Sequence, residues 1–109
     1  MTDKRIVLTT TGSQDEARKI ARHMVENTLA ACVNILPQVE SIYRWQGKVE
    51  SAAEWLLLIK TTAARVPEVR DAIHALHSYD LPECIEISIE DGSELYLKWL
   101  ADSVQEMKK

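Results

Sequence analysis

Histidine and cysteine are the residues of this 109-residue chain best suited to metal chemistry. Imidazole nitrogens suit copper, and thiolates favour copper(I). His74 and His77 are three residues apart, a spacing that lets two side chains face the same side of a helix. Two ligands do not make a selective site, and a solvated or hydrogen-bonded histidine is the commoner arrangement beside an apolar stripe. Cys32 and Cys84 are far apart and form no C-x-x-C pair, so we expect two reduced, buried thiols.

Motifs for catalysis are missing from the sequence. It contains no phosphate-binding G-x-x-x-x-G-K-S/T or G-x-G-x-x-G, no G-x-S-x-G nucleophile motif and no H-E-x-x-H metal motif. Its three glycines have structural interpretations, since Gly12 and Gly92 precede predicted helices and Gly47 lies in a predicted turn. No triad or acid–base pair can be named from spacing, so we expect no enzyme and no required cofactor.

Composition indicates a soluble globular protein with one domain, residues 1–109. Apolar residues make up 46% of the chain and charged residues 28%, which is ordinary for such a domain. The net charge of −4 would repel a polyphosphate, so nucleic acid is not an expected partner. No signal-like segment opens the chain and no apolar run approaches the roughly 18 residues that span a membrane. We therefore expect a cytoplasmic protein without a membrane partner.

Periodicity predicts the element order β-α-β-β-α-β followed by a third helix. Strands are predicted at residues 6–11, 31–45, 48–62 and 83–90, the middle two forming one hairpin around Gln46-Gly47. A first helix should begin at Ser13, with Glu16 completing a capping box, and run to about residue 28. Pro67 suits the first turn of the second helix. This order predicts an α+β, ferredoxin-like fold, in which both helices of the βαββαβ unit cover one face of a four-stranded antiparallel sheet.

Alternation predicts which side chains share a face of each strand. In the first hairpin strand the odd positions from residue 31 to Trp45, Val39 and Tyr43 among them, are expected on one side. In the last strand Ile85, Ile87 and Ile89 are expected to point inward. Pro37 cannot donate a ladder hydrogen bond, so its strand should lie at a sheet edge or contain a bulge.

The predicted hairpin is too long for its own domain. A 14-residue strand spans about 46 Å at roughly 3.3 Å per residue. A compact chain of this length has a radius of gyration near 13 Å and a diameter of about 34 Å. Tyr43 and Trp45 near the tip would each forgo burial worth about 1.5–3 kcal/mol if left in water. We expect a second copy of the chain to cover them; the alternative is a hairpin that curls back onto its own domain.

Four segments form a set with a recognisable order and spacing: residues 29–37 (LAACVNILP), 41–48 (SIYRWQGK), 59–62 (IKTT) and 77–83 (HSYDLPE). In these segments, and over residues 5–100, the chain resembles the CutA divalent-cation-tolerance family. The resemblance implies a ferredoxin-like fold assembled as a tight homotrimer, with Tyr43 and Trp45 at the subunit interface and long strands that pair across subunits. It also implies a link to tolerance of copper and other divalent metals, and copper(II) binding is associated with some members.

The resemblance carries a metal site over only in part. In copper-binding bacterial relatives the metal is associated with a cysteine at the end of the first strand and with two adjacent histidines. These positions fall on Thr9, Leu76 and His77 here. Leu76 cannot coordinate a metal and Thr9 is a poor copper ligand, so His77 is left as the metal candidate, with Tyr79 and Glu83 from the same segment.

Two functions from different classes follow. The first is a metal-responsive trimer that binds copper or another divalent cation weakly, or acts on metal tolerance indirectly. The second is a signalling or scaffold trimer that binds a small anion or a protein partner in its intersubunit clefts. The polar residues of the shared segments, Lys60, Glu54, Tyr79 and Glu83, would line such a cleft or form structural hydrogen bonds.

Overall fold

The computed structural model describes residues 2–105 and follows the predicted order of elements. The elements are β1 (Lys4–Thr11), α1 (Gln14–Glu26), β2 (Cys32–Trp45), β3 (Lys48–Thr62), the 3-10 turn η1 (Ala63–Arg65), α2 (Val66–Leu76), β4 (Ile85–Ser88) and α3 (Glu94–Ser103). The α+β prediction with a long hairpin and an extra C-terminal helix is confirmed.

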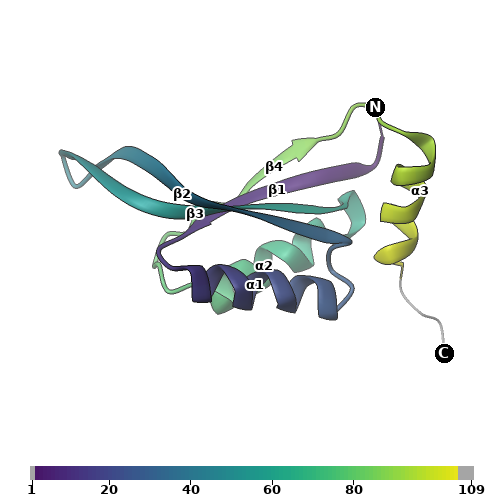
Figure 1. Cartoon of the computed structure of the whole chain (residues 1–109), viewed down its shortest axis with the longest axis horizontal. Coiled ribbons are helices and arrows are strands. Elements are labelled where there is room, and N and C mark those ends of the chain that lie inside the picture. The colour runs from purple at the N-terminus through teal and green to yellow at the C-terminus, as the bar shows by residue number, and fades with distance from the viewer. Residues whose placement is uncertain (1, 106–109) are drawn as a thin grey trace.

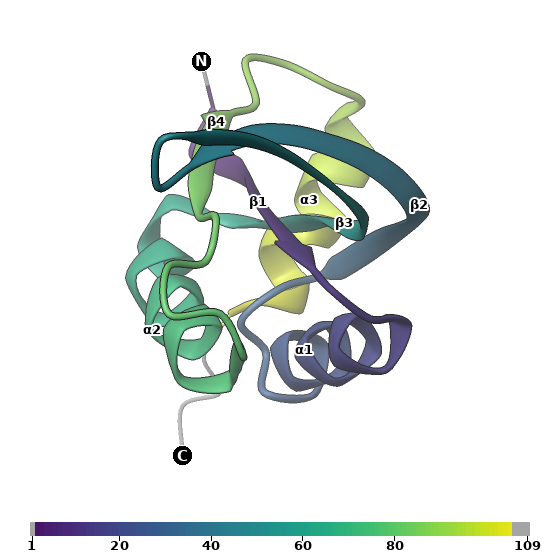
Figure 2. The ribbon, with the colours of Figure 1, turned by 90° about the vertical axis from the view of Figure 1, so that its left-hand side faces the viewer.

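The four strands form one antiparallel sheet in the order β2-β3-β1-β4. Figures 1 and 2 show α1 and α2 side by side on one face of this sheet, whereas α3 stands at the end where the chain begins. The core lies between the two helices and the sheet. Its fully buried apolar side chains include Val7, Ile20, Met24, Leu57, Ile59, Val69 and Ile73. Within residues 2–105, no helix has the length and apolar character that a membrane span requires.

Helix α1 begins with half of the predicted capping box. The Ser13 hydroxyl accepts a hydrogen bond from the Glu16 backbone N–H at 3.2 Å, which satisfies one of the free donors at the helix start. The Glu16 side chain does not reach back to Ser13 but points to His77, described below. The helix ends at Glu26, before the predicted residue 28, because Thr28 adopts a left-handed conformation with φ 55°.

The hairpin turn has the predicted chemistry. Gln46 and Gly47 have φ values of 50° and 82°, the two positive angles that a two-residue turn matched to strand twist requires. β1 ends at Thr11 opposite Trp55, so the half of the hairpin nearest the turn extends beyond the sheet (Figure 1). The molecule is accordingly 48 Å long but only 29 Å and 21 Å in the other directions.

A bulge at Pro37 and Gln38 changes which side chains share a face. The pairing of β2 with β3 shifts between Leu36 and Val39, and Gln38 has a φ of 56°. Both alternatives for Pro37 therefore hold, since β2 is also an edge strand. One extra residue reverses the alternation that follows it.

The prediction of a single face for the first hairpin strand is therefore wrong beyond the bulge. Before it, Val33 lies opposite Ile59 on the helix-covered face; after it, Tyr43 lies opposite Glu50 and Trp45 opposite Lys48, on the other face. Val39, Tyr43 and Trp45 thus share the face that the helices leave open.

The inward direction predicted for the last strand is also wrong within the subunit. Ile85 pairs with Leu8 and Ile87 with Ile6, and these β1 residues alternate with the buried Val7. Ile85 and Ile87 therefore lie on the sheet face away from α1 and α2, where they are 50% and 45% exposed. The alternation was correct, but a period of two does not reveal which face the helices cover.

Candidate functional site

A cavity of about 730 Å³ lies between the overhanging hairpin and the segment that follows α2. Its walls are Thr10 of β1, residues 41–43 and 45 of β2, Glu54 of β3 and residues 79–83. Pro82 in this segment is buried, whereas Leu81 is 73% exposed. With the bulge described above, Tyr43 and Trp45 lie on the open side of the hairpin, where they line the cavity.

His77 anchors the segment that forms one wall. Its side chain is fully buried, its Nε2 atom lies 2.6 Å from the Thr10 carbonyl oxygen, and its Nδ1 atom lies 3.1 Å from the Tyr79 backbone nitrogen. Because a carbonyl only accepts and a backbone N–H only donates, the ring carries its proton on Nε2 and accepts at Nδ1. One ring thereby fastens the end of α2 to the end of β1. Glu16 Oε1 lies 3.3 Å from the same Nδ1 atom.

This geometry leaves neither nitrogen of His77 a vacant lone pair. Nε2 bears a proton, and the Nδ1 lone pair accepts the Tyr79 N–H. Residues 2–105 contain no group of three or more His, Cys, Asp or Glu side chains placed to hold a metal ion. The metal role of His77 stays a prediction, and it requires the bond from Tyr79 to be displaced.

The other residues considered as ligands are dispersed. His74 is exposed and its Nδ1 atom lies 2.8 Å from the Arg70 carbonyl oxygen, so it does not face the buried ring of His77. Thr9 is fully buried, and its hydroxyl oxygen has no hydrogen-bond partner among the described residues. Cys32 and Cys84 are separate free thiols as expected, but each is partly exposed, so the expectation that they are buried is wrong.

A hydrogen bond between Tyr79 and Glu54 joins the two walls of the cavity. The Tyr79 hydroxyl donates to Glu54 Oε2 at 2.8 Å. Burial and this bond raise the pKa of Tyr79 to about 12, so the phenol stays neutral at physiological pH. The Tyr79 hydroxyl also packs closely against Gly12, since a Cβ atom added at Gly12 would lie 3.0 Å from the Tyr79 hydroxyl oxygen.

The charged side chains of the cavity are all acidic. Glu54, Asp80 and Glu83 line it, and the described lining residues include no Lys, Arg or His. Burial, and then the nearby Glu54 carboxylate, raise the pKa of Glu83. The cavity therefore combines negative charge with the rings of Tyr43, Trp45 and Tyr79, a combination that repels anions and attracts cations.

Lys60 lies away from the other residues predicted for a cleft. It pairs with Ile6 and Cys32 near the opposite end of β1, and its Nζ atom lies 3.4 Å from the Tyr96 hydroxyl and 5.7 Å from the centre of that ring. Within one subunit the structure brings Tyr79 and Glu83 together with Glu54, but not with Lys60.

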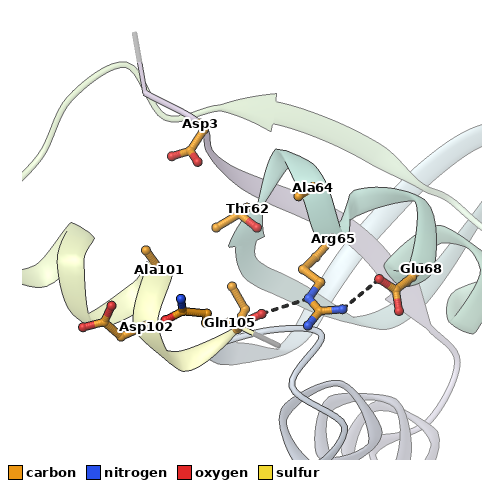
Figure 3. A pocket seen from close by; sticks show the side chains of 9 residues that line it. Asp3, Thr62, Ala64, Arg65, Glu68, Ala101, Asp102 and Gln105 are labelled. Carbon is orange, nitrogen blue, oxygen red and sulfur yellow. Dashed lines mark hydrogen bonds and ion pairs between the residues drawn. The ribbon is translucent and has the colours of Figure 1, made fainter. Parts of the chain in front are cut away.

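A second cavity, of about 520 Å³, lies between η1 and the end of α3 (Figure 3). Arg65 is 7% exposed there, and its guanidinium donates to the Val104 carbonyl oxygen and to Glu68 Oε1, both at 2.9 Å. Asp3 and Asp102 also line this cavity. The bonds of Arg65 join α3 to the start of α2, so we assign this region a structural role.

Sequence reasoning missed two contributors to the site. Glu16 was predicted as part of a helix capping box, so its position beside His77 was not expected. The Thr10 carbonyl has no sequence signal, because every residue carries one. The sequence contained one indication that the segment after α2 is held in place: the helical pattern ends at Leu76, and His77 and Tyr79 follow it.

Comparisons with known proteins agree with one another. The family model described as "CutA1 divalent ion tolerance protein" matches residues 5–103. The "Divalent-cation tolerance protein CutA" of Thermus thermophilus is 46% identical over 100 residues, which are 92% of this chain and 97% of that protein. "Protein CutA, chloroplastic" of Arabidopsis thaliana is 42% identical over 92% of this chain, which spans 55% of that longer relative.

Solved structures show the same fold. The crystal structure of CutA from Xylella fastidiosa superimposes with a TM-score of 0.93 at 39% identity, covering 95% of this chain and 100% of that chain. The "Periplasmic divalent cation tolerance protein CutA" from Archaeoglobus fulgidus superimposes with a TM-score of 0.91 at 39% identity, covering 94% and 99%. The relatives thus include proteins described as chloroplastic and as periplasmic.

Proposed function

Because the chain belongs to the CutA1 divalent ion tolerance protein family, we propose that it acts in the cellular response to divalent metal ions as a cytoplasmic homotrimer. The names of its relatives describe tolerance of divalent cations and no reaction. We propose no catalytic activity for it.

We propose self-association because of the sheet face that α1 and α2 leave open. Leu36, Ile85 and Ile87 are 39–50% exposed on the face opposite α1 and α2. An apolar surface of this kind, on a sheet with two exposed edge strands, is typical of a protein interface. Burying it is worth about 25 cal/mol per Å². A closed ring of identical subunits would cover the faces and edges of all its members equally.

The hairpin tip extends the same face. Tyr43 and Trp45 are 42% and 46% exposed, and the bulge places them on the side that bears Leu36 and Leu56. A neighbouring subunit that covers the open sheet would therefore also reach these rings. Residues 79–83 cover them only in part.

For metal, we propose that the protein binds copper or another divalent cation weakly, or acts on metal tolerance indirectly. His77 supplies one ligand at most, and only after its Nδ1 atom releases the Tyr79 N–H. A selective site needs more ligands than one imidazole, so a copper site at His77 would draw further ligands from a changed local structure or from another subunit.

Copper(II) titration by calorimetry of chelator-treated protein, with its mass measured by light scattering, tests both parts. We expect a mass of about 37 kDa, three times 12.4 kDa. The variant His77→Ala should lose copper binding, whereas the exposed His74→Ala should keep it. A mass of 12.4 kDa would refute the trimer. Binding unchanged in His77→Ala would remove His77 from any metal site.

The second candidate is a signalling or scaffold trimer with a ligand or protein partner in its clefts. The 730 Å³ cavity favours this candidate, because its size suits a small molecule. Its acidic lining disfavours an anion at this position. An anion would find its cationic partner at Lys60, at the other end of the sheet.

A further inference from the structure

We propose that the cavity between the hairpin and residues 79–83 binds an ammonium or guanidinium group. Glu54 and Glu83 supply the countercharge, and the rings of Tyr43, Trp45 and Tyr79 form the walls. The site shares Tyr79 and Glu83 with the segment of the metal candidate His77, but it requires no metal and no change at His77.

The carboxylate of Glu54 is buried without a countercharge among the described residues. Glu54 is only 7% exposed, and among residues 2–105 it forms no ion pair. Its hydrogen-bond partner is the phenol of Tyr79, which is neutral. A buried charge is costly unless an opposite charge accompanies it. The described residues therefore supply no cation to accompany this carboxylate.

A second carboxylate in the same cavity increases this need. Glu83 lines the cavity with Glu54, and the two repel each other, as the raised pKa of Glu83 reflects. Asp80 adds a third acidic side chain to the lining. One cation placed between Glu54 and Glu83 would relieve the repulsion and form charge-assisted hydrogen bonds with both.

The aromatic walls select an organic cation over a metal ion. Rings attract a cation within about 6 Å of their centre, and they also pack against the apolar part of an organic molecule. A metal ion would need a group of three or more ligands, which the described residues do not provide. The cavity of about 730 Å³ is also far larger than a dehydrated ion requires.

The cationic group can come from two sources. One is a free small molecule, and the other is a Lys or Arg side chain of a second copy of this chain. Both are compatible with the wall residues, because Tyr43 and Trp45 also lie on the face proposed for subunit contact. The chemistry is the same, and the experiment below separates the sources.

Three probes that differ mainly in charge test the site: 2-phenylethylammonium, neutral 2-phenylethanol and anionic 3-phenylpropionate. Calorimetry gives their affinities for the assembled protein, and the indole N–H signal of Trp45 in NMR spectra reports the place of binding. We expect the ammonium to bind about 10- to 100-fold more tightly than the alcohol, as a hydrogen bond to a charged group predicts, and the carboxylate to bind weakest.

The variants Glu54→Gln and Glu83→Gln remove one charge each from the cavity, and in Glu54→Gln the new amide oxygen still accepts the Tyr79 hydroxyl. The control Glu40→Gln makes the same change on the opposite face of β2, since Glu40 pairs with Ala53. Should Glu54→Gln fail to fold, Glu83→Gln, at a less buried position, carries the test.

Each outcome assigns or rejects the site. Ammonium binding that both cavity variants weaken at least tenfold, and Glu40→Gln does not, supports a free ligand. Absence of probe binding, together with dissociation of the assembly at about tenfold higher concentration in both cavity variants alone, supports a side chain of a second copy. The proposal is overturned if neither effect appears, or if the ammonium binds no better than 3-phenylpropionate. None of these readouts involves metal, so they are separable from the copper titration.

Discussion

The Nε2 atom of His77 donates to the carbonyl oxygen of Thr10 at 2.6 Å, across 67 positions of sequence. The ring also accepts the Tyr79 N–H, so it links the end of α2, the end of β1 and the wall of the cavity. The residue predicted as the metal candidate is therefore also a structural joint.

Replacement of this ring should destabilise the protein. His77→Ala removes two hydrogen bonds and leaves a void in a buried position, so we expect the free energy of unfolding to fall by about 2–4 kcal/mol. Urea denaturation at a fixed protein concentration measures this change. The exposed His74→Ala should alter stability by less than about 0.5 kcal/mol. A loss of the same size in both variants would contradict the structural role of His77. The same measurement shows whether His77→Ala is folded, which the copper titration requires.

The phenol of Tyr79 should make stability depend on alkaline pH. Its pKa is raised to about 12 from 10.0, so the folded state holds a proton that the unfolded state releases. This contribution is complete below pH 10 and is lost as the pH rises toward 12. Tyr79→Phe should lack this part of the decline, which denaturation curves of both proteins at pH 9 and 11 would reveal. At neutral pH the variant should be less stable by about 1–3 kcal/mol, because Glu54 loses its donor. Parallel pH profiles for the two proteins would exclude this role of Tyr79.

The carboxyl of Glu83 provides a test with a defined sign. Burial and Glu54 raise its pKa, so its ionised form is disfavoured in the folded subunit and its protonation stabilises the fold as the pH falls. Without added ammonium, Glu83→Gln should therefore be more stable than the parent at pH 7, and the difference should vanish near pH 4. Differential scanning calorimetry at the two pH values measures it. A variant that is less stable at pH 7 would indicate a cation already beside Glu83, which corresponds to a side chain of a second copy.

Removal of the bulge residue should leave the assembly intact. Without Gln38, Pro37 lies opposite Trp55, so Leu36 keeps its partner Leu56 and Tyr43 keeps its partner Glu50 on the open face. We therefore expect the light-scattering mass per assembly to stay that of the parent. Gln38→Gly is the matched control, since glycine tolerates the φ of 56° and keeps the bulge. A fall of the mass toward that of one chain in the deletion variant alone would show that association requires the bulge itself.

A charge on the open sheet face should also separate the subunits. Ile87→Lys places an ammonium in the apolar area around Ile6, so dissociation should occur at much higher protein concentration than in the parent. Val25→Lys on α1 makes the same change at a residue that is 44% exposed but lies outside that face. Sedimentation analysis compares the two variants. Equal behaviour would argue against contact through the open face.

Local chemistry allowed most of the fold to be predicted. Gln46-Gly47 specified a tight turn and Ser13 specified the start of α1, because each depends only on neighbouring backbone. Pro37 also indicated an irregularity correctly. What the local pattern could not provide was its consequence, since only the register with β3 shows that Tyr43 changes face.

The candidate site was less predictable than the fold. Tyr79, Glu83 and Glu54 could be named as polar residues of shared segments, and they do line one cavity. Lys60 is on the same strand as Glu54, but its position at the other end of β1 depends on strand pairing. The orientation of Ile85 and Ile87 also depends on pairing, so the open face could not be recognised from alternation alone.

The bulge restricts how the hairpin can vary in length among related chains. One residue added to each strand beyond Gln38 would preserve the backbone pairing, yet it would turn the side chains of the tip to the opposite side. Two residues added to each strand would keep Tyr43 and Trp45 on their side and move the tip outward by about 6.8 Å. Insertions and deletions in this region should therefore occur in steps of two residues per strand, so the lengths of related hairpins should form a spaced series.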